Sequence, residues 1–349
     1  MRIASVASAF PDHCFAQDEI QDALRRYWGD KLENPELLGR FHSRVGVDYR
    51  YLAFPLEKYD QFSTWGETNS AWLEVAQELG EKAIDAALDR AGLVRHDIDA
   101  LFVVSITGIA SPSLDARLIN RMRLRPDIKR TPIFGLGCVG GAIGLTRAVD
   151  YVLAYPKQNA VLLAVEICSL TLQRDDLSTA NLISAALFAD GAAAAIVTGS
   201  ERPPAGPQIV STRSVFYPGT EELMGWNISE KGFRIVLSPR LPEMIKRHLA
   251  DDIDAFLADS GLGRRDIGRW IIHTGGPRVL RSIEDALDLS RRELAVSWEC
   301  LRQFGNVSSA SVLLVLEEVI MRQAPEPGTL GLVMAVGPGF CSELLLLRW

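Results

Sequence analysis

The sequence predicts an α/β protein built from two similar βαβ halves. The main observation is an internal repeat: at an offset of 169 residues, 74–98 matches 243–267 at ten of 25 positions. Each copy has the pattern of an amphipathic helix followed by a glycine, Gly92 or Gly261, which suits a left-handed helix end. An apolar run follows each copy, at 100–105 and 270–274. Buried strands that alternate with helices indicate parallel sheets.

The remaining elements extend this pattern along the chain. Residues 1–10 form an apolar run with one positive charge that stops at Pro11, too short for a signal peptide, and predict a first strand. Strands are also expected at 131–134 and 192–198. The same offset carries Gly137 onto Asn306, and both open long apolar helices, at 139–153 and 307–321.

A proline-rich connector at 200–207 marks the boundary, so that residues 1–200 and 201–349 are the two predicted halves. The alternative is that any two helix–glycine–strand units resemble each other by chance. A true duplication predicts halves related by a pseudo-twofold axis, with the loops at the carboxyl ends of equivalent strands meeting at one site.

Composition excludes several classes of protein. The net charge of −7 gives no basic surface for nucleic acid, and no apolar run is long enough to span a membrane. The five cysteines are scattered without a Cys-x-x-Cys pair, which argues against a disulfide scaffold or a zinc site. We therefore expect a cytoplasmic protein without a metal.

Three polar residues stand where loops of the two halves should meet. Cys138 lies among five glycines in FGLGCVGGAIG, between a strand and a helix. His273 ends an apolar strand and enters a glycine turn, and Asn306 stands at the head of the helix equivalent to the one after Cys138. Pseudo-twofold symmetry would bring the three side chains together.

A cysteine acts as a nucleophile only as its thiolate. A helix N-terminus and a nearby imidazolium both favour the negative charge, and we therefore expect a lowered pKa for Cys138. The bland alternative is that a free cysteine is a small buried apolar residue, which we expect of Cys14, Cys168, Cys300 and Cys341. The histidines other than His273 lie in polar surroundings and are expected at the surface. Asn306 alone could be a simple helix cap.

Four motifs together resemble a known family. They are FGLGCVGG at 134–141, IHTGGP at 272–277, GNVSSA at 305–310 and GPGFCSE at 337–343. They are similar to motifs of the chalcone synthase-like, or type III, polyketide synthases of the bacterial type, and the resemblance runs to the chain end. It implies a thiolase-like fold with α-β-α-β-α layers, in agreement with the repeat.

The resemblance implies a role for each of the three residues. Cys138 would take an acyl group from a coenzyme A thioester and be held as thiolate by His273. His273 and Asn306 would donate hydrogen bonds to the thioester oxygen of malonyl-CoA as it loses carbon dioxide. The carbanion would then attack the acyl group on Cys138. The implied substrates are an acyl-CoA starter and malonyl-CoA, the enzyme would be a homodimer, and no cofactor is needed.

The resemblance also implies residues that bind the substrates. Phe188 would separate the coenzyme A tunnel from the reaction cavity, and Ile235 stands where the plant enzymes have a second gate phenylalanine. Ser111 aligns with a methionine that crosses the dimer interface. The other expected cavity residues are Thr171, Ser308, Gly337, Pro338 and Gly339. The lysines for the nucleotide end are not matched, and Arg50 and Arg278 are our substitutes.

Two other functions share this fold. A ketoacyl synthase III-like enzyme that uses acyl carrier protein has a Cys-His-Asn set, but it typically carries His-Gln-Ala-Asn, where this chain has HTGG at 273–276. A non-catalytic partner subunit would tolerate loss of the nucleophile, which is present here. The product stays open: the small Ser111 and aliphatic Ile235 suggest an aliphatic starter that yields alkylpyrones or alkylresorcinols. A small aromatic polyketide from malonyl units alone is the alternative.

Overall fold

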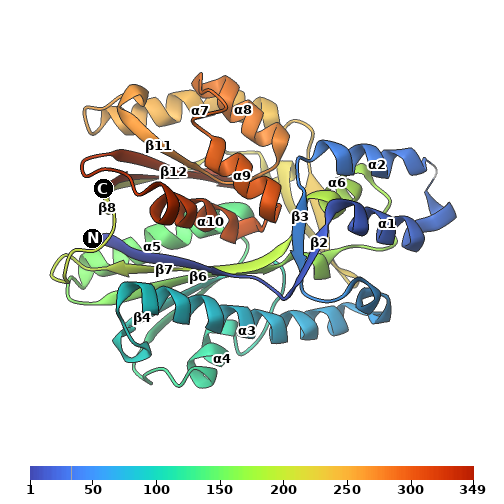
Figure 1. The fold of residues 1–349 in the computed structure, drawn as a ribbon, viewed down its shortest axis with the longest axis horizontal. Coiled ribbons are helices and arrows are strands. Elements are labelled where there is room, and N and C mark those ends of the chain that lie inside the picture. Colours follow the sequence, from blue (N-terminus) through green and yellow to red (C-terminus); the bar gives the residue numbers. More distant parts are fainter. Residues whose placement is uncertain (33) are drawn as a thin grey trace.

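The computed structural model describes residues 1–32 and 34–349 and has five layers (Figure 1). The two parts of one nine-stranded mixed sheet form two layers, which are separated by one layer of helices and covered by helices on both outer faces. This confirms the predicted α/β class. The outer helices are α3 (Trp65–Ala91) and α4 (Leu114–Arg121) on one side, α7 (Leu241–Ala258) and α8 (Pro277–Leu287) on the other.

The strands of the two halves meet at one junction. The order β5-β4-β6-β7-β1 continues into β8-β13-β12-β11, with β1 joined to β8 where Arg2 pairs with Gln208. Within the first half β4 is parallel to both β5 and β6, and within the second half β11 is parallel to β12. The bounds are β1 Arg2–Ala9, β4 Ala100–Val104, β5 Lys129–Ile133, β6 Asn159–Ile167, β7 Asp190–Thr198, β8 Gln208–Phe216, β11 Ile267–Ile272, β12 Leu330–Gly337 and β13 Cys341–Arg348.

The internal repeat forms the same unit twice. Helix α3 leads into β4 and helix α7 leads into β11, each through a short 3₁₀ turn, η3 (Arg95–Asp97) or η7 (Arg264–Asp266). Gly92 has φ 66° and Gly261 has φ 67°, the left-handed conformation that a side chain would strain. Both glycine helix ends are therefore confirmed.

Identical residues of the repeat also make identical contacts. The Arg95 guanidinium Nε donates to Asp85 Oδ1 over 2.7 Å, and Arg264 Nε donates to Asp254 Oδ1 over 2.6 Å. In each copy an arginine of the 3₁₀ turn is thus tied to the preceding helix. The repeat preserves this contact as well as the apolar pattern.

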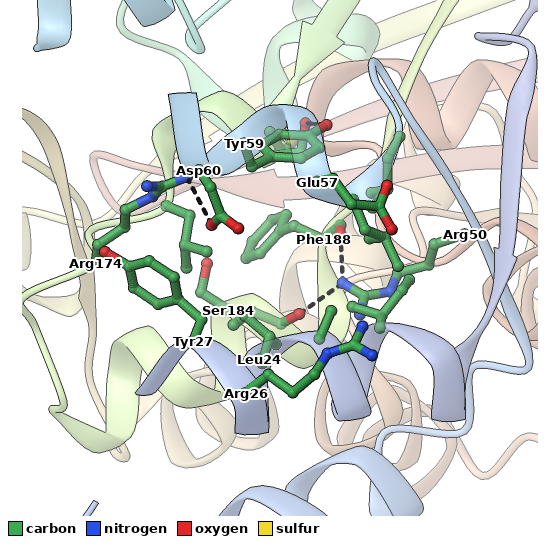
Figure 2. A pocket seen from close by; sticks show the side chains of 18 residues that line it. Leu24, Arg26, Tyr27, Arg50, Glu57, Tyr59, Asp60, Arg174, Ser184 and Phe188 are labelled. Atoms are coloured by element: carbon green, nitrogen blue, oxygen red, sulfur yellow. Dashed lines mark hydrogen bonds and ion pairs between the residues drawn. The ribbon is translucent and has the colours of Figure 1, made fainter. Parts of the chain in front are cut away.

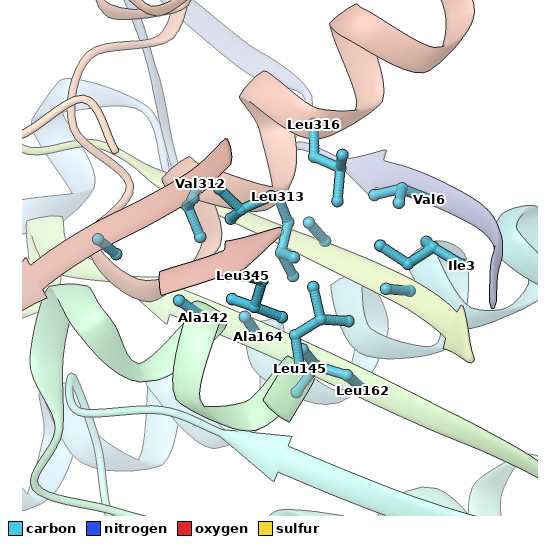
Figure 3. Close-up of a cluster of buried hydrophobic side chains, with 14 of the residues drawn as sticks. Ile3, Val6, Ala142, Leu145, Leu162, Ala164, Val312, Leu313, Leu316 and Leu345 are labelled. Atoms are coloured by element: carbon cyan, nitrogen blue, oxygen red, sulfur yellow. The ribbon is translucent and has the colours of Figure 1, made fainter. Parts of the chain in front are cut away.

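The central layer consists of α5 (Gly140–Ala154) and α10 (Ser311–Glu318), which lie between the two sheet layers. Figure 3 shows their side chains, Leu145 and Leu313 among them, meeting Ile3 and Leu162 of one sheet layer and Leu345 of the other. Burial of this apolar surface from both halves is the main force that holds the halves together.

The two central helices begin later than the sequence suggests. Each is preceded by one 3₁₀ turn, η4 (Gly137–Val139) or η8 (Ser308–Ala310), and α10 ends in a π-helical segment, η9 (Val319–Gln323). The 3₁₀ turns tighten the backbone at Cys138 and just after Asn306.

A smaller cap lies against one end of the layers, at the right of Figure 1. It comprises β2 (His13–Ala16), β3 (Tyr49–Leu52), α1 (Gln17–Trp28), η1 (Gly29–Lys31), α2 (Pro35–Arg44), η2 (Leu56–Gln61), η5 (Cys168–Thr171) and α6 (Thr179–Leu187). The hairpin β9 (Met224–Ser229) and β10 (Gly232–Leu237), with η6 (Glu221–Leu223), packs near α6, and α9 (Ala295–Phe304) packs against α10.

Two expectations about burial are wrong. His42 is 3% exposed, because α2 turns it inward beside Arg50, and Cys14 is exposed on β2. Cys168, Cys300 and Cys341 are buried as expected. Across residues 1–32 and 34–349, none of the helices has the length and apolar character needed to cross a membrane.

Candidate active site

Cys138 lies in η4, directly before α5, and only 6% of it is exposed. The preceding residue must be a glycine: Gly137 has φ 54°, and a Cβ there would come within 2.8 Å of the Pro338 ring. Pro338, directly after β12, therefore packs against the turn that holds the thiol. The loop after β12 fixes the position of Cys138.

Asn306 and Ser308, from the other half, lie next to Cys138. The Cys138 thiol donates to Ser308 Oγ at 3.8 Å. The Asn306 side-chain oxygen accepts from Ser308 N at 2.8 Å and from Ser311 Oγ at 3.3 Å. Because this oxygen is occupied, the amide NH₂ is the group left to face the sulfur. The structure thus brings together residues 170 positions apart.

His273 follows β11 and is 2% exposed. Its backbone N–H donates to Met334 O at 3.0 Å, and the next residue, Thr274, donates its hydroxyl to Gly305 O at 3.4 Å. These contacts place His273 between β12 and the segment that carries Asn306. Within the described residues neither ring nitrogen has a hydrogen-bond partner, so no bond to Cys138 is formed.

The pKa values run against the expected thiolate. Burial raises the pKa of Cys138 to about 12, while hydrogen bonds from Ser308 and Asn306 act to lower it. Burial lowers the pKa of His273 to about 3. Burial therefore favours the neutral form of both groups, because the helix start does not offset the loss of water around the sulfur.

Sequence reasoning missed Glu166, a fully buried carboxyl group at the end of β6. It accepts hydrogen bonds from Ile106 N at 3.0 Å and Thr107 Oγ1 at 2.9 Å, and from Ser309 Oγ of the other half. Burial raises its pKa to about 7, and its negative charge raises the pKa of Cys138. The signal was a single acid within the otherwise apolar run NAVLLAVEI.

The Gly337-Pro338-Gly339 loop lies over the nucleophile turn. A Cβ on Gly337 would come within 2.6 Å of Val139 N, so this strand end can approach η4 only as glycine. Thr171, in η5, is 8% exposed and donates its hydroxyl to Cys168 O at 2.7 Å. Thr171 is thus held by its own turn.

Phe188 follows α6 and borders a cavity of about 560 Å³ (Figure 2). The cavity lies between α1, η2, η5 and α6, with apolar walls from Leu24, Leu52 and Leu172. Cys138, His273 and Asn306 do not line it. Phe188 therefore stands between this cavity and Asn306, with which it forms an isolated parallel bridge.

The two arginines chosen for coenzyme A have different surroundings. Arg50 is 2% exposed, and its Nη1 donates to the backbone oxygens of Ala185 and Phe188 (Figure 2). Arg278 is exposed, in the first turn of α8. Arg278 is accessible to a phosphate, whereas Arg50 already serves two carbonyl groups.

The remaining predicted residues lie apart from the thiol. Ile235 is half-buried in β10, paired with Trp226 of β9. Ser111 is exposed, just before α4. Their roles as gate and interface residues stay predictions.

The arrangement can support acyl transfer through a thioester. It offers a sulfur nucleophile, an imidazole that can take up its proton, and an amide donor beside the sulfur, all shielded from water. Among the described residues no three His, Cys, Asp or Glu side chains cluster as a metal site would require.

Comparisons with known proteins agree with this chemistry. The family model for the N-terminal domain of chalcone and stilbene synthases matches residues 1–202, and that for the C-terminal domain matches 208–349. The chain is 50% identical to 1,3,6,8-tetrahydroxynaphthalene synthase of Streptomyces peucetius subsp. caesius, covering 99% of this chain and 93% of the relative.

Two more distant proteins extend the likeness. A putative chalcone synthase of Bacillus subtilis is 32% identical, over 99% of this chain and 98% of the relative. The crystal structure of 1,3,6,8-tetrahydroxynaphthalene synthase from Streptomyces coelicolor A3(2), a bacterial type III polyketide synthase, superposes with a TM-score of 0.95 at 31% identity. That superposition covers 100% of this chain and 99% of the other.

Proposed function

The chain belongs to the chalcone and stilbene synthase family of type III polyketide synthases, and we propose that it condenses malonyl-CoA on Cys138 into a tetrahydroxynaphthalene. The product assignment is supported by the relative at 50% identity, which is a 1,3,6,8-tetrahydroxynaphthalene synthase. Enzymes of the ketoacyl synthase III type and non-catalytic partners are not favoured, because the relatives are type III synthases.

The observation that carries the proposal is the meeting of Cys138, Asn306 and Ser308 from the two halves. In the loading step, the Cys138 proton moves to His273 and the sulfur attacks the thioester carbonyl. The bond from that carbonyl to the coenzyme A sulfur breaks, and the proton on His273 passes to the leaving sulfur. Cys138 ends as a thioester, and His273 is again neutral.

Extension uses a second malonyl-CoA. Its bond to the carboxylate breaks, carbon dioxide leaves, and the electron pair forms an enolate whose oxygen accepts hydrogen bonds from Asn306 Nδ2 and the His273 ring. One such donor contributes about 3 kcal/mol to the rate in a dry site. The enolate carbon then attacks the Cys138 thioester and displaces the sulfur, so that the chain grows by two carbons.

The naphthalene skeleton accounts for the starter. Ten ring carbons correspond to five two-carbon units, which five malonyl-CoA molecules supply when each, the starter included, loses its carboxyl group as carbon dioxide. No metal or redox cofactor takes part in these steps. The aliphatic starter suggested by Ile235 and Ser111 is the competing outcome, and we assign Arg278 to the coenzyme A phosphates because it is exposed at a helix start.

The proposal is tested with the purified chain and malonyl-CoA as sole substrate. We expect mass spectrometry to show a tetrahydroxynaphthalene, with coenzyme A and carbon dioxide released in equal amounts. Cys138→Ala should abolish condensation, and Cys300→Ala, a buried thiol of α9, should retain it. Product formed only with an added fatty acyl-CoA would refute the malonyl starter. Condensation by Cys138→Ala would refute the nucleophile.

We also propose a homodimer in the cytoplasm. Ile109, in the segment between β4 and α4, and Phe134, directly after β5, expose 49% and 45% of their surface, and β5 is a terminal strand of its sheet. An exposed edge strand with apolar neighbours favours pairing with a second copy. Sedimentation should give twice the chain mass, and Phe134→Asp should shift it to the monomer. A monomeric wild-type chain would rule the dimer out.

A further inference from the structure

Arg50 makes contacts that a coenzyme A ligand would not need. It lies in β3, and its Nη1 donates to Ala185 O at 2.6 Å and to Phe188 O at 2.9 Å. Its Nε donates to Gln17 Oε1 at 3.0 Å. Figure 2 shows the guanidinium at the wall of the cavity, bonded to these backbone oxygens, while Nη2 has no hydrogen-bond partner among the described residues. Arg50 thus binds the protein's own backbone.

These bonds close the C-terminal end of α6. The last carbonyl groups of a helix have no partners within it and carry partial negative charge. Arg50 satisfies the carbonyl of Ala185 and that of Phe188, and Gln17 Nε2 donates to Ala186 O at 2.7 Å. Arg50 and Gln17, which also bond to each other, therefore hold the backbone at the end of α6 in place.

The same segment holds the backbone of Asn306. Asn306 N donates to Leu187 O at 2.9 Å, and Ala189 N donates to Asn306 O at 3.0 Å. The stem of Arg50 also lies against the preceding residue, since a Cβ on Gly305 would be 3.2 Å from Arg50 Cγ. One arginine therefore touches both strands of the bridge that carries Asn306.

We propose that Arg50, braced by Gln17, is a positioning residue that sets the place of the Asn306 amide for malonyl-CoA decarboxylation. The proposal rests on the function proposed above for Asn306. Arg50 does not contact the substrate: it holds residues 185–189, and these hold Asn306. A guanidinium suits this task because Nη1 and Nε donate from two fixed positions in one plane, to two carbonyls and an amide oxygen, whereas an ammonium donates from a single nitrogen.

The test is Arg50→Lys, which keeps the charge and removes the fork. We expect kcat for malonyl-CoA decarboxylation to fall roughly 10- to 100-fold, since small misplacements of a catalytic group have effects of this size. KM for malonyl-CoA should stay within about twofold, because uniform binding is untouched. The alkylation rate of Cys138 should fall much less than kcat, because Arg50 makes no bond to the nucleophile turn and Ser308 still bonds to the sulfur when the Asn306 amide is displaced.

Arg25→Lys is the matched control. Arg25 is an exposed arginine of α1 whose ion pair is with Asp22 at 3.6 Å, and its replacement should leave all three readouts unchanged. Gln17→Ala is the milder second variant. It removes the hydrogen bonds of Gln17 to Arg50 and Ala186 and keeps Arg50, so kcat should also fall, but by a smaller factor. It decides the question if Arg50→Lys does not fold.

The other outcomes are separable. A raised KM at unchanged kcat would overturn the proposal and return Arg50 to coenzyme A binding. A wild-type kcat in Arg50→Lys would also overturn it. So would a double variant in which Arg50→Lys lowers the kcat of Asn306→Ala by the same factor as it lowers the wild-type kcat, because residues that act as one unit have non-additive effects. If Asn306→Ala itself decarboxylated malonyl-CoA at the wild-type rate, the proposed function would fail. If Asn306→Ala lost decarboxylation while Arg50→Lys kept it, only the positioning role of Arg50 would be refuted.

Discussion

At Cys138, burial and hydrogen bonding act on the pKa of the thiol in opposite directions. Burial prevails and raises it to about 12, although Ser308 and Asn306 stabilise the thiolate. Burial lowers the pKa of His273, so its imidazole is neutral, and neither ring nitrogen has a hydrogen-bond partner among the described residues. The nucleophile would therefore form when a thioester arrives and the proton moves from sulfur to nitrogen, instead of being stored as an ion pair.

This state predicts how Cys138 reacts with iodoacetamide. Far below the pKa the thiolate fraction rises about tenfold per pH unit, so the alkylation rate should do the same between about pH 7 and about pH 9. The measurement is mass spectrometry of the peptide that contains Cys138, with exposed Cys14 as internal reference. A rate that is flat across this range would show a stable thiolate–imidazolium pair and contradict the neutral state.

Single residues were predicted from the sequence only where a motif marked them. Cys138 and Asn306 stand beside glycines at helix starts, and these local features placed both correctly at one site. The burial of His42 was misjudged and Glu166 was missed, because the burial of both depends on segments far away in the chain. Glu166, for example, bonds to Ser309 of the other half, which no local pattern can reveal.

At the scale of elements, the two central segments cross at a point without room for a side chain. A Cβ on Gly141 of α5 would come within 2.1 Å of the Ser309 carbonyl oxygen in η8. This contact lies between the turn that carries Cys138 and the turn that follows Asn306. The close approach of the two turns thus depends on a glycine.

Gly141→Ala should therefore be destabilising by about 2 kcal/mol, since overpacking a core forces backbone shifts. The fall should appear in the free energy of unfolding measured with urea, together with reduced condensation. Gly66→Ala is the matched control in α3, where the nearest atom to a new Cβ is 3.9 Å away. It should be neutral or stabilising. Equal behaviour of the two variants would show that the crossing tolerates a side chain.

The elements themselves were well predicted where periodicity and glycine agreed. The helix ends at Gly92 and Gly261 match because a left-handed residue is a local requirement. The central helices were placed too early, since a 3₁₀ turn and an α-helix share the same apolar pattern over a few residues. Their difference arises from the packing of one half on the other.

Over the whole molecule, buried ionisable groups shape the stability. Glu166 has its pKa raised to about 7 by burial, so the folded protein retains a proton that the unfolded chain releases near the ordinary value of 4.5. Its contribution is fully present below about pH 4.5 and is lost as the pH rises through about 7. His42 and His273, with lowered pKa values, act in the opposite direction: the stability they support is present above about pH 6.5 and lost in acid.

Glu166→Gln isolates the contribution of the acid. The amide resembles the protonated carboxyl group and does not ionise, so the variant should gain stability relative to wild type as the pH rises from about 5 to about 8. The gain should reach about 3 kcal/mol, the value of the pKa shift. The two histidines are common to both proteins and cancel in the difference. Urea unfolding at several pH values measures it, and a constant difference would contradict the raised pKa.

The division of the site between the halves has a practical consequence. A chain cleaved within 200–207 would carry the sulfur on one fragment and the amide on the other, so that neither piece could build a polyketide by itself. Colour or mass signals from the aromatic product would appear only after the fragments recombine. The protein could thereby serve as its own reporter of reassembly.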